Sequence, residues 1–181
     1  MRIGVSGTHG TGKTTLVEEL CAALPGYMAV EEPYLVLEEE GYPFADPPTS
    51  ADYRAQLALS VQQLGSGAAD VVFDRTPADF LAYLVACGRS VEGEVDEAGQ
   101  QALESAMSSL DLLVLLPVTP ETERLLPGAE LPGLRGRMDE ALAEILHGDP
   151  LDAWERVPIL ELAGPLDRRV EAVLAALAGL A

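Results

Sequence analysis

Near its amino terminus the sequence carries a glycine-rich segment whose spacing suits a phosphate chain. Residues 7–14 read Gly-Thr-His-Gly-Thr-Gly-Lys-Thr and fit the pattern G-x-x-x-x-G-K-[ST]. The glycines let successive backbone N–H groups point at phosphate oxygens, and the start of the next helix adds a favourable dipole. Lys13, the sole lysine of the chain, would reach the β- and γ-phosphates, and the Thr14 hydroxyl would hold Mg²⁺. The residues predicted to bind the nucleotide here are Gly7, Thr8, His9, Gly10, Thr11, Gly12, Lys13, Thr14 and Thr15.

Acidic side chains stand at the ends of two predicted strands. The second strand ends in Glu31-Glu32, and the third ends in Asp74, which Arg75 follows. In an open parallel sheet the carboxyl ends of the strands face the ligand crevice. Asp74 is therefore a candidate for binding Mg²⁺, and Glu32 for accepting a proton as general base. Because adjacent side chains on a strand point to opposite faces, Glu31 and Glu32 should not share that role.

Basic side chains could offset the charge of a transferred phosphoryl group. Arg75 is placed to hold that group or the acceptor. Arg135 and Arg137 lie one residue apart in the stretch 127–136, whose glycines and prolines predict an irregular, mobile loop. Two arginines on such a loop suit the clamping of phosphates.

The elements that must position these residues alternate between strands and helices. Apolar runs predict strands, and a helical period of apolar residues predicts helices. Pro33 is expected to end the second strand, and Thr76-Pro77-Ala78-Asp79 fits a capping box, which gives Asp79 a structural role. This alternation predicts a three-layer α/β domain with a five-stranded parallel sheet. Strands are expected at 2–6, 28–32, 70–74, 111–118 and 157–162, and helices at 13–24, 50–64, 77–87, 96–109, 138–146 and from 165 to 180.

Composition limits the partners. The 181 residues include 30 acidic and 11 basic ones, which give a formal net charge of −19. Such a charge repels nucleic acids and anionic membranes, so neither is expected as a partner. The densest apolar stretches, 112–116 and 172–181, are too short to span a bilayer. We expect one domain over 1–181, a cytoplasmic location, and reduced core thiols at Cys21 and Cys87.

Several classes of phosphate-loop protein fit the sequence poorly. A GTPase needs an Asn-Lys-x-Asp segment to read guanine, and the chain contains no asparagine. The Leu-Ser-Gly-Gly-Gln signature of ABC proteins is also missing. AAA+ machines usually carry Asp-Glu after the third motif strand and a helical lid domain, whereas this chain has Asp74-Arg75 and little room for such a domain. An Asp followed by an Arg suits a small-molecule kinase better.

The chain resembles the P-loop nucleoside and nucleotide kinases, most nearly the deoxynucleoside kinases and the small kinases of the nicotinamide riboside kinase type. The resemblance covers nearly the whole chain and begins with the phosphate loop. Glu31-Glu32-Pro33 is similar to the Glu-Pro of deoxynucleoside kinases, whose glutamate is the general base, and Asp74-Arg75-Thr76 to their Glu-Arg-Ser. Residues 134–140 resemble an arginine-bearing lid whose R-x-R arginines close over the phosphates.

Further expectations rest on the resemblance alone. Gln56 lies on the helix where deoxynucleoside kinases use a glutamine to read the base. Gly164-Pro165 stands where the last strand leads into the adenine-side loop. The resemblance also implies the strand order 2-3-1-4-5, a small lid over about 127–147, and ATP and Mg²⁺ as cofactors, and it allows a homodimer. Asp74 in place of glutamate and the short chain leave the acceptor's identity open.

The predicted function is ATP- and Mg²⁺-dependent phosphoryl transfer to a hydroxyl of a small nucleoside-like acceptor. Two alternatives stay open. One is an ATP-binding regulatory ATPase or switch without a metabolite acceptor; the other is a polynucleotide 5′-hydroxyl kinase, which the negative charge disfavours. The residues expected to carry the chemistry are Lys13, Glu32, Asp74, Arg75, Arg135 and Arg137, with Thr14 and Asp74 toward the metal and Gln56 and Arg75 toward the acceptor.

Overall fold

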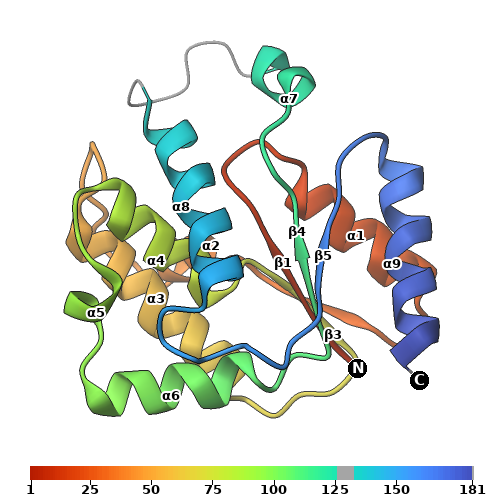
Figure 1. The fold of residues 1–181 in the computed structure, drawn as a ribbon, viewed down its shortest axis with the longest axis horizontal. Helices are drawn as coiled ribbons and strands as arrows, with labels where there is room; N and C mark the ends of the chain where they lie inside the picture. Colours follow the sequence, from red (N-terminus) through yellow and green to blue (C-terminus); the bar gives the residue numbers. More distant parts are fainter. Residues whose placement is uncertain (126–132, 181) are drawn as a thin grey trace.

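Five parallel strands run through the centre of the molecule in the order β2-β3-β1-β4-β5 (Figure 1). The structure is a computed structural model that describes residues 1–125 and 133–180, so residues 127–132 of the expected lid lie outside the described part. The predicted fold class, the parallel sheet and its strand order are confirmed. The strands are β1 (Arg2–Ser6), β2 (Met28–Val30), β3 (Val71–Asp74), β4 (Leu112–Leu115) and β5 (Ile159–Glu161).

Helices cover both faces of this sheet (Figure 1). Helices α1 and α9 lie together on one face, and α3, α4, α6 and α8 lie on the other. None of the described helices is long and apolar enough to cross a membrane. The helices are α1 (Lys13–Ala23), α2 (Pro33–Glu39), α3 (Ser50–Leu64), α4 (Pro77–Ala86), α5 (Val91–Glu94), α6 (Glu97–Met107), α7 (Pro120–Leu125), α8 (Leu134–Gly148) and α9 (Leu166–Leu180).

The core consists of two apolar layers, one on each face of the sheet. On β3, Val72 faces the layer of α1 and α9, whereas its neighbours Val71 and Phe73 face the layer of α3, α4 and α8. This alternation follows from the pleat of a strand. Because both faces are covered, β3 and β4 are buried along their whole length, and β4 is the continuous apolar run that the sequence predicted. The packed sheet positions the residues that follow the carboxyl ends of its strands.

Some elements differ from the sequence-based expectations. Pro33 does not merely end a strand; it opens helix α2 at the first helical position, where its missing N–H costs nothing, and Glu32 precedes it as the N-cap residue. Helix α8 begins at Leu134 instead of 138, behind Gly133 with φ 79°. The predicted loop was therefore wrong at its end. The short helices α5 and α7 were not predicted, and Cys87 is exposed instead of lying in the core.

Candidate phosphoryl-transfer site

The P-loop, residues 7–14, connects β1 to α1 at the carboxyl edge of the sheet (Figure 1). Gly7 has φ 153°, and a Cβ there would lie 2.5 Å from the carbonyl oxygen of Leu116, so no side chain fits. Gly12 has φ 88° and serves as the N-cap of α1. Both positions require the freedom of glycine. The loop thus has the local geometry that brings backbone N–H groups toward a bound phosphate.

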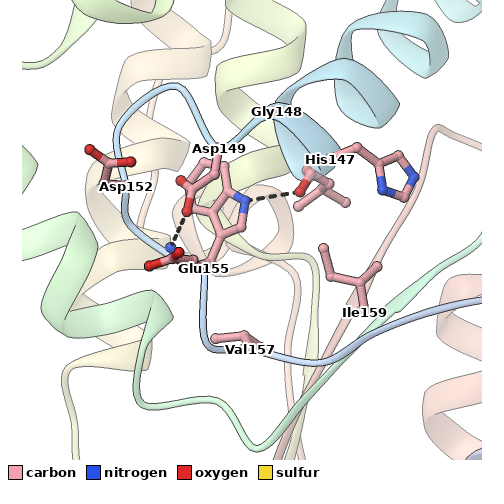
Figure 2. Close-up of a pocket in the computed structure, with 9 residues that line it drawn as sticks. His147, Gly148, Asp149, Asp152, Glu155, Val157 and Ile159 are labelled. Carbon is pink, nitrogen blue, oxygen red and sulfur yellow. Dashed lines mark hydrogen bonds between the residues drawn. The ribbon is translucent and has the colours of Figure 1, made fainter.

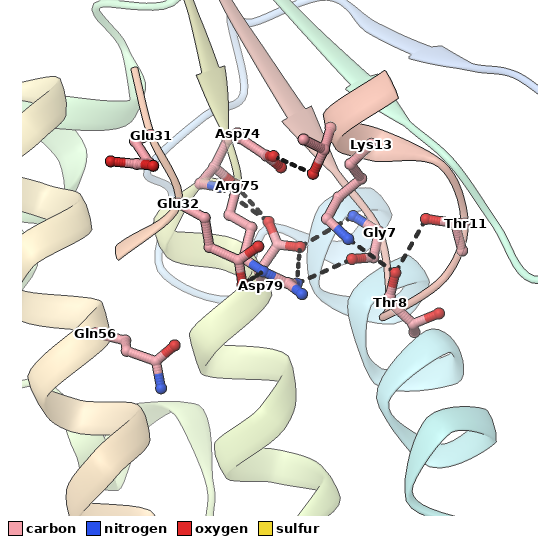
Figure 3. Close-up of polar contacts among 12 residues, drawn as sticks. Gly7, Thr8, Thr11, Lys13, Glu31, Glu32, Gln56, Asp74, Arg75 and Asp79 are labelled. Atoms are coloured by element: carbon pink, nitrogen blue, oxygen red, sulfur yellow. Dashed lines mark hydrogen bonds and ion pairs between the residues drawn. The ribbon is translucent and has the colours of Figure 1, made fainter. Parts of the chain in front are cut away.

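Lys13 lies near Asp74 at the P-loop (Figure 3), and Thr14 is hydrogen-bonded to Asp74. The Lys13 ammonium is buried and donates a hydrogen bond to the Thr8 carbonyl oxygen at 2.8 Å. Burial, with a smaller contribution from the Arg75 charge, lowers the pKa of Lys13 to about 8. The Thr14 hydroxyl, in the first turn of α1, donates to Asp74 Oδ2 at the end of β3 at 2.6 Å. The fold therefore brings together the two residues predicted for the metal.

The second oxygen of Asp74 is a polar atom in need of a partner. Asp74 Oδ1 is buried and has no hydrogen-bond partner within residues 1–125 and 133–180. Burial also raises the pKa of this carboxyl group. A hard cation beside Asp74 and the Thr14 hydroxyl would satisfy that oxygen. In the described ranges no group of three or more His, Cys, Asp or Glu residues could hold a metal by itself.

Three basic side chains without a carboxylate partner contact carbonyl oxygens of the P-loop. A fourth, Arg75, which is also paired with carboxylates, donates to the Gly7 carbonyl oxygen at 3.1 Å. Besides Lys13, Arg135 Nε donates to the His9 oxygen at 3.0 Å, and Arg169 Nη1 donates to the Thr11 oxygen at 2.8 Å. Within the described part of the chain, none of the three has a carboxylate within 4.0 Å. Their charge is therefore not cancelled by an ion pair. In a chain of net charge −19, this loop is a local positive region suited to an anion.

Arg169 is a site residue that sequence reasoning missed. Its Nε donates to the Gly164 oxygen at 2.8 Å, so one buried guanidinium joins the P-loop to the segment that opens α9. It thereby holds Gly164 and Pro165, which were predicted near the adenine, beside the P-loop. The sequence shows only Arg168-Arg169 at the start of a helix. Helical spacing could have suggested that just one of them faces the sheet, and Arg168 is the exposed one, paired with Glu171.

On the other side of Lys13, a buried ion-pair network joins the ends of β2 and β3 (Figure 3). Arg75 Nε donates to Glu32 Oε1 at 2.8 Å, and Arg75 Nη1 lies 3.3 Å from Asp79 Oδ1. Burial opposes the charge of Glu32, but the neighbouring Arg75 outweighs it and lowers the pKa of that carboxyl group. Glu32 is thus ionised at neutral pH and able to accept a proton. Glu31, its neighbour, points elsewhere.

Asp79 is the second residue whose role was underestimated. The predicted capping box is present, since Asp79 Oδ2 accepts from the Thr76 N–H at 2.9 Å. In addition, Asp79 Oδ1 accepts from the Gly7 N–H at 2.9 Å and from Arg75. This fully buried carboxylate therefore ties the start of the P-loop to the Glu32–Arg75 pair. Arg75 also has φ 80°, a conformation that costs a non-glycine residue about 1–3 kcal/mol and that these bonds maintain.

Aromatic side chains lie beyond the ion pair. The Arg75 guanidinium carbon is 5.6 Å from the centre of the Tyr83 ring, and Tyr83 stacks on Tyr53 of α3 at 4.7 Å with an angle of 3° between the rings. Gln56, one turn further along α3, is buried and donates to the Asp52 carbonyl oxygen at 3.2 Å. Figure 3 shows Gln56 and Glu32 on the side of the site away from Thr8 and Thr11. The residues predicted for the acceptor therefore lie on one side of the P-loop.

The two arginines expected on a mobile lid lie instead on the first turn of helix α8. Arg135 faces the P-loop, and its guanidinium also donates to the carbonyl oxygen of Thr122 in helix α7 at 3.4 Å. Arg137 is exposed, and its Nε donates to the Ala86 carbonyl oxygen at the end of α4, at 3.2 Å. The structure thus brings Arg135 to the P-loop and holds Arg137 away from it.

A separate cavity of about 400 Å³ lies where α8 leads toward β5 (Figure 2). Its wall includes Trp154, whose indole N–H donates to the Leu146 carbonyl oxygen, and Asp149, whose carboxylate accepts from the Trp154 N–H at 3.0 Å. This segment is at the end of the sheet opposite the P-loop (Figure 1). None of the residues predicted for the chemistry lines this cavity.

The comparison with known families gives one match over most of the chain. Residues 2–169 match a family model described as an AAA domain, and the chain belongs to this family. The sequence argued against an AAA+ machine, because the third motif strand ends in Asp74-Arg75 and not in Asp-Glu. The matching family nevertheless carries the AAA name, so that argument does not separate the chain from every AAA-type family. The comparison with curated proteins gives no match.

Solved structures of P-loop kinases have the same fold. Deoxyadenosine kinase from M. mycoides, with dCMP and dCDP bound, has a TM-score of 0.66 at 15% identity over 99% of this chain and 100% of its own. Thymidylate kinase from Candida albicans has a TM-score of 0.61 at 15% identity over 98% of this chain and 91% of its own. NadR in complex with NR has a TM-score of 0.63 at 20% identity; 96% of this chain aligns with 48% of NadR. The predicted resemblance to nucleoside and nucleotide kinases is confirmed at the level of the fold.

Proposed function

We propose that this protein is a small-molecule kinase that transfers a phosphoryl group from Mg²⁺-bound ATP to a hydroxyl group of a nucleoside-like acceptor. The observation that carries this proposal is the Glu32–Arg75 pair beside the positive P-loop. Holding a triphosphate needs only the P-loop side. A carboxylate fixed by a buried arginine next to that loop adds what a hydroxyl acceptor needs, namely a base at the point of attack.

The residues divide the work by position. P-loop N–H groups and Lys13 would bind the β- and γ-phosphates, with Arg135 and Arg169 adding positive charge at the loop. Glu32 would take the proton of the acceptor hydroxyl at Oε1 or Oε2, while Arg75 orients that carboxylate. Asp74 and Thr14 would hold Mg²⁺, which when bound neutralises charge on the phosphates. Gln56 and the nearby tyrosines would contact the acceptor.

The test is ADP release from Mg·ATP, measured without an acceptor and with a panel of deoxynucleosides, ribonucleosides, nicotinamide riboside, nucleoside monophosphates and a 5′-hydroxyl oligonucleotide. A kinase predicts stimulation by one class of small acceptor. Lys13→Met should reduce the stimulated rate to below about one thousandth, because a cation at the transferred phosphoryl group is lost. Arg168→Met removes the same charge from the exposed face of α9 and should leave the rate unchanged.

Two results would contradict the proposal. A Lys13-dependent background rate that no compound of the panel raises would indicate a regulatory ATPase or switch. Stimulation by the oligonucleotide alone would indicate a polynucleotide kinase.

A further inference from the structure

The charges and rings around Glu32 bear on which acceptor this site can take, a question that rests on the proposed function above. Both nucleoside and nucleotide kinases have this fold, so the fold does not choose between an acceptor with a phosphate and one without. A bound monophosphate brings up to two negative charges, which must meet a cation or water. The basic side chains near Glu32 therefore decide the matter.

All eleven basic side chains lie within the described residues. Of these, Arg75 is the one that bonds to the group formed by Glu32, Tyr53, Gln56 and Tyr83. Its guanidinium is already held by two carboxylates, those of Glu32 at 2.8 Å and Asp79 at 3.3 Å. One positive charge thus faces two negative ones. This network has no positive charge left over for an acceptor phosphate.

Two other arginines, Arg54 and Arg89, are paired with a carboxylate of their own. Arg54, on the same helix as Gln56, makes two hydrogen bonds to the Glu94 carboxylate, at 2.6 and 2.9 Å. Arg89 pairs with the same glutamate at 3.2 Å. By contrast, Lys13, Arg135 and Arg169 contact only carbonyl oxygens of the P-loop and of neighbouring segments. Arg137 also has only a carbonyl partner, but it bonds to Ala86 at the end of α4 and not to the P-loop or the Glu32 network. The cations available to phosphate at this site are therefore on the P-loop side, where ATP would bind.

Aromatic rings are concentrated on the acceptor side. The chain has nine aromatic residues, and five of them form two groups here. Tyr53 stacks on Tyr83, and Phe44 contacts the rings of Tyr34 and Tyr42. Two of the tyrosine hydroxyls donate to carboxylates, Tyr34 to Glu38 and Tyr42 to Asp52. The charged groups that these two hydroxyls contact are therefore negative. Rings of this kind stack on planar ligands. The five residues are Tyr34, Tyr42, Phe44, Tyr53 and Tyr83.

We infer that the acceptor is a phosphate-free compound with a planar ring, a nucleoside in its chemistry and not a nucleoside monophosphate. A neutral or cationic ring compound would meet aromatic side chains and a negative environment. A monophosphate would set its charge against Glu32 with no free cation to receive it. The site thus selects by repulsion as well as by contact.

The direct test compares matched pairs of acceptors on the wild-type protein. The kcat/KM for ADP release would be measured with deoxyadenosine against dAMP, thymidine against dTMP, and free ribose as a hydroxyl acceptor without a planar base. We expect each effective nucleoside to exceed its monophosphate, and ribose, by about 100-fold or more. A monophosphate that equals or exceeds its nucleoside overturns the inference while the proposed kinase function stands.

If no compound stimulates ADP release, the proposed function fails and binding decides the inference. Titration calorimetry would then use the same pairs with the P-loop filled by Mg²⁺ and a non-hydrolysable ATP analogue. Binding of a nucleoside with no detectable binding of its monophosphate supports a phosphate-free site. Preferred binding of the monophosphate, or binding of neither, overturns it.

A charge-adding variant tests the cause. Gln56→Lys would place a cation beside the acceptor, and Gln62→Lys would place the same charge on the exposed face of the same helix. The ratio of monophosphate to nucleoside kcat/KM should rise at least about tenfold in Gln56→Lys and stay constant in Gln62→Lys. Equal ratios in two folded variants would contradict the electrostatic explanation. Should Gln56→Lys fail to fold, as judged by its melting curve, the wild-type pairs decide alone.

Discussion

The donor side and the acceptor side of this site differ in how their residues are distributed along the chain and in how their charges are balanced. The P-loop is one segment of eight residues, and the basic groups around it bond to carbonyl oxygens. The acceptor side joins Glu32, Gln56, Arg75 and Asp79 from four elements, and its arginine faces two carboxylates. A phosphate chain can be bound by the backbone of one short segment. An acceptor is bound by side chains that are far apart in the sequence and come together only in the folded protein.

The largest effect expected from breaking this comparison is at Glu32. Glu32→Gln keeps the size of the side chain and a partner for Arg75 but removes the base, so kcat should fall about 10²- to 10⁴-fold while ATP affinity stays within about threefold. Glu31→Gln is the matched control, because it makes the same change on the neighbouring, exposed residue. Steady-state kinetics and nucleotide titrations would measure both. An equal loss of ATP affinity and kcat would move Glu32 from the acceptor side to the metal or the fold.

The same difference explains what could be predicted from the sequence. The P-loop and the strand order followed from local spacing and from the resemblance, and both are found in the structure. Asp79 was assigned to its capping box alone, since nothing local shows that its second oxygen reaches Gly7, 72 residues away in sequence. Arg169 contacts Thr11 over a separation of 158 residues. Long-range contacts of this kind depend on how helices pack, which apolar periodicity does not specify.

Two local signals were misjudged. Pro33 was interpreted as a stop, although proline is equally at home in the first turn of a helix, and helix α2 begins there. Helix α7 is preceded by Thr119, whose side chain and backbone exchange hydrogen bonds with Thr122, a capping pattern that the sequence displays. A third difference concerns Arg135 and Arg137, which lie on helix α8 and not on a loop. Side chains two residues apart on a helix point in different directions. Only Arg135 can face the P-loop in this arrangement.

A smaller effect should sharpen the comparison at Arg169. Arg169→Gln removes an unpaired charge and the bridge between Thr11 and Gly164, so ATP affinity should fall about tenfold. The acceptor KM should not change, because Arg169 lies on the donor side. Arg168→Gln removes the same charge from a surface pair and should leave both constants unaffected. Calorimetry with Mg·ATP and kinetics at saturating ATP separate the two sides; a change in acceptor KM alone would contradict the division.

The smallest effect concerns the proton on Lys13. In the free protein its pKa is about 8, lowered chiefly by burial, whereas bound phosphates would restore the charge. Binding at pH 8 should therefore take up about half a proton, and ATP affinity should fall about twofold from pH 7 to pH 8.

For folding the sign is opposite. Between pH 8 and 10.5 the lysine is more fully protonated in the unfolded chain than in the folded protein, so the Lys13 contribution to the free energy of unfolding rises with pH. Calorimetry in two buffers of different ionisation enthalpy counts the proton, and Lys13→Met should abolish this part of the pH dependence of unfolding. Release of a proton on binding would contradict this prediction, because it would show that ATP does not raise the pKa of Lys13.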